Sequence, residues 1–140
     1  MINQTNAPYA ALVLRVALGV MFVAHALLKI VVFTVPGTIQ FFESVGLPGF
    51  SAYIVIAAEL AAGALLIAGL ATRWVALATI PILLGAAWVH LPNGWVFTAQ
   101  GGGWEYPVFL AIAAFVQFLL GDGAYALSSR PAPLATCRAG

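Results

Sequence analysis

Residues 8–33 read PYAALVLRVALGVMFVAHALLKIVVF, an almost wholly apolar run that is interrupted by Arg15, His25 and Lys29. A helix needs roughly 20 mostly apolar residues to cross the hydrocarbon core of a bilayer, and this run is long enough. A charged side chain in hydrocarbon costs free energy, so such residues usually face a bundle interior or a polar cavity. The run therefore predicts a spanning helix with one polar face turned inward.

The composition of the whole chain supports a membrane protein. The chain has 140 residues, of which 64% are hydrophobic and 6% are charged, and its mean hydropathy is +1.07. Soluble domains carry about 25% charged residues, so this chain could not cover a surface that faces water. A net charge of +1 excludes a nucleic-acid partner bound by phosphate neutralisation. The single cysteine, Cys137, excludes an intrachain disulfide and a CxxC thiol relay.

Three further apolar segments complete the predicted architecture, at residues 52–70, 74–91 and 106–120. We expect an all-α, transmembrane four-helix bundle. The stretch 36–50 predicts a short interfacial helix between the first two spans, with Thr38 as its N-cap and with Gly46 and Pro48 at its end. Residues 92–104, rich in glycine, predict a loop, and Gly121 is expected to cap the last helix.

Basic residues predict the orientation of the bundle. Arg15, Arg73, Arg130 and Arg138 fall on one side of it, so both termini are expected in the cytoplasm. The first segment has no preceding basic residue and no clear cleavage site, so we expect a retained helix rather than a signal peptide. We assign residues 1–123 to the transmembrane domain. Residues 124–140 are predicted to form a disordered cytoplasmic tail.

The polar side chains of the first segment share one helical face. They fall, with two apolar neighbours, within an arc of about 80°: Arg15, Leu18, Phe22, His25 and Lys29. His25 and Glu59 are predicted at the same depth, roughly 12 Å from the outer ends of their helices. Lys29, His90 and Glu105 lie nearer the same boundary. Five ionisable groups should therefore converge at one end, whereas Arg15 lies towards the other, where Asp122 or Gln117 could meet it.

Two interpretations of this cluster compete. In the structural one, Lys29 and Glu59 form a buried ion pair, His25 bonds a backbone carbonyl, and His90 and Glu105 are merely interfacial. In the functional one, His25, Glu59 and His90 line a cavity that handles protons or binds a polar head group. A metal site built from His25, Glu59, His90 and Glu105 is a weak alternative, because no helix carries a paired ExxH motif.

The segment 57–64 reads AAELAAGA. Small residues let helices approach closely, so we expect this face to pack inside the bundle. A homodimer face is the less favoured alternative.

Several short motifs occur in a recognisable order along the chain. They are Leu14-Arg15-Val16-Ala17-Leu18-Gly19 with His25 and Lys29, Gly46-Leu47-Pro48, Ala58-Glu59-Leu60, Gly69-Leu70-Ala71-Thr72-Arg73, His90-Leu91-Pro92-Asn93-Gly94 and Gly103-Trp104-Glu105-Tyr106-Pro107. With these motifs the chain resembles the DoxX family of small four-helix membrane proteins over about residues 12–121. The family's shared polar positions correspond to Arg15, His25, Lys29, Glu59, Arg73, His90, Asn93, Glu105 and Tyr106.

The resemblance implies a four-helix fold in a bacterial inner membrane and, more loosely, redox work there. Relatives named for the family include a small subunit of a terminal quinol oxidase and a component of a thiosulfate–quinone oxidoreductase. Another is found in a membrane complex with oxidant-detoxifying enzymes. Fold carries over between relatives better than activity does.

We therefore expect a quinone-linked membrane subunit of a redox complex. Residues expected to bind ligand or handle protons are His25, Lys29, Glu59, His90, Asn93, Glu105 and Tyr106, and Arg15 and Arg73 are expected to be structural charges. Trp88, Trp95 and Tyr106 could stack on a quinone ring. The sequence has no flavin motif, no convincing haem ligand pair and no cysteine redox centre, so electrons would come from a partner protein. The alternatives are a small-solute transporter or channel and a scaffold or assembly factor; whether the protein is an enzyme is left open.

Overall fold

The computed structural model describes residues 3–128, and every regular element in that range is helical. In chain order these are α1 (Ala7–Leu27), a π-helical turn η1 (Leu28–Val32), α2 (Val35–Ser44), α3 (Ser51–Ala68), α4 (Thr72–His90), a 3-10 turn η2 (Leu91–Asn93) and α5 (Glu105–Leu120). The predicted all-α fold with a short helix between the first two long ones is confirmed.

Three helical stretches are long and apolar enough to cross a membrane, namely Ala7–Val32, Ser51–Ala68 and Thr72–Asn93. The fourth long helix, α5, has 16 apolar-rich residues and so measures about 24 Å. That is shorter than the roughly 30 Å of a hydrocarbon core, and a local thinning of the bilayer would accommodate it. The chain is thus a multi-pass membrane protein.

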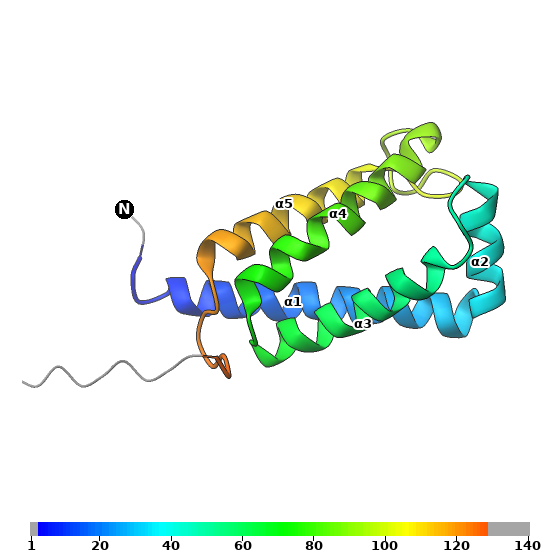
Figure 1. Ribbon diagram of the computed structural model, residues 1–140. Helices are drawn as coiled ribbons and strands as arrows, with labels where there is room; N and C mark the ends of the chain where they lie inside the picture. The colour runs from blue at the N-terminus through cyan, green and yellow to red at the C-terminus, as the bar shows by residue number, and fades with distance from the viewer. Residues whose placement is uncertain (1–2, 129–140) are drawn as a thin grey trace, which may run out of the picture.

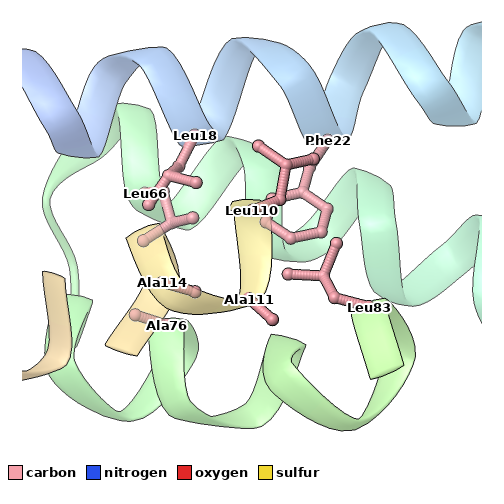
Figure 2. Close-up of a cluster of buried hydrophobic side chains, with 8 residues drawn as sticks. All are labelled: Leu18, Phe22, Leu66, Ala76, Leu83, Leu110, Ala111 and Ala114. Atoms are coloured by element: carbon pink, nitrogen blue, oxygen red, sulfur yellow. The ribbon is translucent and has the colours of Figure 1, made fainter. Parts of the chain in front are cut away.

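The long helices form two pairs. α1 packs mainly against α3, and α4 packs mainly against α5. Figure 1 shows the pairs meeting near the α3–α4 connection and spreading apart toward α2. The buried core lies between the pairs, where Leu18 and Phe22 of α1 face Leu66, Leu83 and Leu110 (Figure 2). The bundle is therefore tight at one end, and we call its wider end the α2 end.

Two glycines set the distance between α1 and α3. A Cβ atom on Gly19 would lie 2.9 Å from the carbonyl oxygen of Gly63, and one on Gly63 would lie 2.8 Å from that of Gly19. Neither position can hold a side chain without moving the backbones apart. The small residues of α3 therefore serve close packing within the chain, as expected, and the homodimer alternative stays a prediction.

The start of α2 differs from the prediction. Thr34, not Thr38, is the N-cap, because its hydroxyl accepts a hydrogen bond from the Gly37 amide at 3.3 Å. Pro36 is tolerated in the first helical turn, which lets the helix begin one turn earlier than expected. Thr38 is instead buried inside α2, and its hydroxyl donates to the carbonyl oxygens of Lys29 and Thr34, both at 3.0 Å.

The segment after α5 folds back onto the bundle. Gly121 ends α5 with a φ of +84°, as predicted. The Ala124 amide donates to the Pro8 carbonyl at 2.9 Å, and the Ser128 amide donates to the Gly69 carbonyl at 3.1 Å. The predicted disorder therefore does not begin at residue 124. Residues 129–140, which include most of the predicted tail, lie outside the described residues.

Candidate functional site

A cavity of about 890 Å³ lies between the two helix pairs at the α2 end. Ligand pockets typically measure about 300–1,000 Å³, so this one is large enough for a drug-sized molecule. Most of its wall is apolar. The polar side chains in the wall are His25, Lys29, Ser51, Glu59, His90 and Tyr106. The structure thus brings five of the seven predicted ligand or proton residues to one cavity.

An ion pair at this cavity joins Lys29, in the η1 turn that continues α1, to Glu59 of α3. The Lys29 Nζ donates to both carboxylate oxygens of Glu59, each at 2.8 Å. The side chains are only 18% and 8% exposed, respectively. Each charge offsets the cost of burying the other, and hydrogen bonds between charged groups are short and strong. The predicted pairing of Glu59 with Lys29 inside the bundle is confirmed.

Lys29 is presented by an irregular backbone that the sequence analysis missed. It lies in the π-helical turn, where the Phe33 amide donates to the Leu28 carbonyl at 2.9 Å. The following residue, Thr34, has a φ of +63°, which is unfavourable for a β-branched side chain. Such π turns and strained residues are frequent at functional sites. The run of β-branched residues at 30–32 is the only sequence signal for it, since these residues are weak helix formers.

His25 is held in a defined orientation. Its Nδ1 lies 2.8 Å from the carbonyl oxygen of Met21. A carbonyl only accepts hydrogen bonds, so Nδ1 carries a proton in this contact, and Nε2 is an acceptor whenever the ring is neutral. The ring stacks on Tyr106, with centroids 5.9 Å apart and planes inclined by 24°. His25 therefore bonds a backbone carbonyl, as the structural interpretation expects, and also lines the cavity, while its role with protons or a ligand stays a prediction.

His90 contributes a second imidazole to the cavity wall. Its Nδ1 is buried and has no hydrogen-bond partner among residues 3–128. Gly102 leaves room beside it, because a Cβ there would lie 3.6 Å from that nitrogen. Buried polar atoms are normally paired, so this nitrogen is an exception within the described residues, and a ligand contact of His90 stays a prediction.

Asn93 and Glu105 do not line this cavity but hold the loop that covers its end. The Asn93 side-chain amide donates to the carbonyl oxygens of Gly101 and Gly102 at 3.0 and 2.9 Å. The Glu105 carboxylate accepts from the Phe97 amide at 2.8 Å. These contacts fix Gly102 and Gly103, which do line the cavity. A direct contact of Asn93 or Glu105 with ligand stays a prediction.

Arg15 lies at the tight end of the bundle and is only 1% exposed. Its Nη1 donates to the Leu66 and Ile67 carbonyl oxygens at 3.3 and 3.4 Å, and its Nη2 donates to the Ala124 carbonyl at 3.2 Å. The prediction that Asp122 or Gln117 would pair with Arg15 is wrong. Arg15 instead donates to backbone carbonyl groups, while Asp122 accepts from the Ser128 hydroxyl and Gln117 donates to the Gly121 carbonyl.

Arg73 also lies at this end. Its Nε donates to the Phe118 carbonyl at 3.1 Å, and its guanidinium lies 5.2 Å from the centre of the Phe118 ring. Both arginines therefore tie helices together far from the cavity, which agrees with structural roles.

The four residues considered for a metal do not come together. Glu105 lies against the loop, and within residues 3–128 no three His, Cys, Asp or Glu side chains are grouped as a metal ion would require.

The fold and the cavity define a small helical membrane protein with a polar-ended intramembrane pocket. The DoxX family model matches residues 10–91, more than half of the chain, and the chain belongs to the DoxX family. The matched region holds Arg15, His25, Lys29, Glu59 and His90.

One curated relative adds a name. The Bacillus subtilis (strain 168) protein "Putative oxidoreductase CatD" is 48% identical over 75 residues, which cover 54% of this chain and 54% of that protein. The chain thus spans about half the length of the curated relative that it matches. No solved structure matches the chain.

Proposed function

We propose that this protein is a quinone-linked subunit of a redox complex in the bacterial inner membrane. The observation that carries the proposal is the convergence of Lys29, Glu59, His25, Tyr106 and His90 on the wall of one large, mostly apolar cavity. A quinone needs an apolar slot for its ring, donors for its carbonyl oxygens and a nearby proton acceptor.

The side chains at the cavity fit these needs. The Lys29 ammonium and the Tyr106 hydroxyl can donate to carbonyl oxygens, and the neutral His25 ring offers Nε2 as an acceptor. The Glu59 carboxylate holds the Lys29 ammonium in place at 2.8 Å. A bound quinone would supply the two-electron redox chemistry, whereas these residues orient it and hold its protons. A neighbouring phenylalanine, Phe22, contributes to the apolar wall.

A partner protein completes the proposal. The name of the Bacillus subtilis relative supports redox work. The sequence holds one cysteine and no flavin motif, so electrons would reach the quinone from an attached redox protein. In this arrangement the chain is the membrane anchor and quinone site of a larger assembly.

Binding of duroquinone, a quinone without a hydrocarbon chain, to the purified protein tests the proposal. We expect duroquinone to raise the melting temperature of the wild-type protein by stabilising the folded state. His25→Phe keeps an aromatic ring against Tyr106 but removes Nε2, and we expect it to weaken binding by roughly tenfold. Arg73→Gln, at the opposite end of the bundle, is the matched control and should bind normally. A wild-type protein that neither binds duroquinone nor gains stability would exclude the quinone.

A further inference from the structure

The cavity is open along one side of α4. Pro81 and Gly85 line it, and both are exposed rather than covered by other parts of the protein. They are four residues apart, so they lie one above the other on the same face of the helix. A Cβ atom built on Gly85 would meet nothing within 4 Å. The wall at this helix is therefore missing a side chain where the cavity reaches the surface.

The facing edge of the opening is α3. Ser51, Val55 and Glu59, each four residues from the next, form the cavity wall on that helix. Figure 1 shows α3 and α4 separating toward the α2 end. The opening therefore lies between α3 and α4, with Val55 on one side and Gly85 on the other.

The depth of the opening decides what it faces. Gly85 lies five residues before the end of α4 at His90, or about 7.5 Å, and Pro81 lies nine residues before it, or about 13.5 Å. These positions are inside the spanning segment Thr72–Asn93. The adjacent Leu84 is 52% exposed, as suits a residue in contact with lipid. The opening thus faces the hydrocarbon chains of the bilayer rather than water.

We propose that the cavity receives its ligand sideways from the bilayer, through this opening, and that the ligand is an amphiphile with a hydrocarbon chain. The polar head lies against Lys29 and Glu59, and the chain passes between Val55 and Gly85. Apolar cavities do not hold water well, so a chain from the surrounding lipid is the favoured occupant. This inference rests on the proposed function for the location of the ligand site, but not on the head group being a quinone.

A fatty acid with a photoreactive diazirine in its chain tests the route. The full-length protein in lipid nanodiscs is irradiated with this probe, and the labelled residues are mapped by mass spectrometry. We expect adducts on two cavity residues, Val55 and Ile82, as well as on the outward-facing Ile112 of α5. Gly85→Leu places a side chain in the opening and should reduce the Val55 and Ile82 adducts to background while leaving Ile112 labelled.

Ala78→Leu is the matched control, because it adds the same side chain to an exposed position of α4 that does not line the cavity. Val55→Trp narrows the opening from α3 and should likewise reduce the Ile82 adduct to background, so the test does not depend on the folding of the Gly85→Leu variant alone. Adducts confined to outward-facing residues of the wild type, or cavity adducts that survive both substitutions, would overturn the lateral route. Competition with duroquinone tests the proposed quinone ligand separately. If cavity adducts form but duroquinone does not displace them, the lateral route is supported and a quinone as the ligand is contradicted.

Discussion

At the scale of single residues, the Lys29–Glu59 pair has the largest energetic consequence. Both charges sit beside an apolar cavity, and each is acceptable there only because the other lies 2.8 Å away. Removing one partner from a buried pair typically costs about 3–5 kcal/mol, whereas replacing both with neutral groups of similar size costs much less. The pair is thus a point where stability depends on charge balance.

A double-mutant cycle measures this dependence. We expect Lys29→Met to lower the free energy of unfolding by about 3 kcal/mol, because the Glu59 carboxylate is left unpaired. Adding Glu59→Gln should recover much of that loss. Denaturant unfolding of the purified protein in detergent gives the four free energies. The control cycle combines Arg73→Gln with Glu59→Gln and should be additive, since these residues lie at opposite ends. Additive effects for Lys29 and Glu59 would contradict the ion pair.

Counting residues along the two apolar helices matched the depth of Glu59 with His25, whereas Lys29 was expected as its partner because it carries the opposite charge. The sequence could not predict the partners of Arg15. The last carbonyl groups of a helix lack partners within that helix, and Arg15 meets those of Leu66 and Ile67 at the end of α3. Gly69 permits this approach, since its φ is +71° and a Cβ there would collide with the Arg15 guanidinium. Such contacts depend on how two helix ends meet in space, which no spacing rule in one sequence supplies.

At the scale of elements, the four long helices followed from hydropathy alone, but the junction of α1 and α2 did not. Length and apolar content locate a spanning helix within a few residues. A π turn instead depends on one extra residue in a helix that is otherwise regular. In this protein the Thr38 hydroxyl of α2 donates a hydrogen bond to the Lys29 carbonyl of that turn. The same threonine looked like an N-cap because it precedes an apolar helical pattern. Local patterns could not decide between the two roles.

The hydroxyl of Thr38 should therefore stabilise the π turn. Thr38→Val keeps the shape of the side chain but leaves the Lys29 carbonyl without this donor, which should cost about 1–3 kcal/mol. We expect faster amide hydrogen exchange over residues 28–33 together with a lower melting temperature. Thr38→Ser retains the hydroxyl and is the control that should restore slow exchange. Unchanged exchange in the valine variant would show that the turn does not need this bond.

At the scale of the whole molecule, the two ends of the bundle differ in kind. The tight end is closed by Arg15 and by residues 124–128, whereas the α2 end holds the cavity, the ion pair and both histidines. The sequence predicted this asymmetry of polar groups. It did not predict the cavity's size, because the separation of the two helix pairs depends on how they pack in space, which residue spacing does not give. One closed end also means that the described conformation gives no straight path across the membrane.

The difference between the two ends predicts how the bundle is oriented in the membrane. Arg15 and Arg73 both lie at the tight end, and basic residues favour the cytoplasmic side, so we expect the α2 end to face the outside of the inner membrane. Two exposed residues at the α2 end can report on this orientation: Ser44, at the end of α2, and Thr98, in the loop after η2. Each is replaced by cysteine in a Cys137→Ser background. A membrane-impermeant maleimide added to intact cells should label both. Arg73→Cys, at the tight end, is the matched control and should be labelled only after the membrane is opened. Labelling of Arg73→Cys in intact cells, with Ser44→Cys and Thr98→Cys protected, would invert the bundle and place the cavity on the cytoplasmic side.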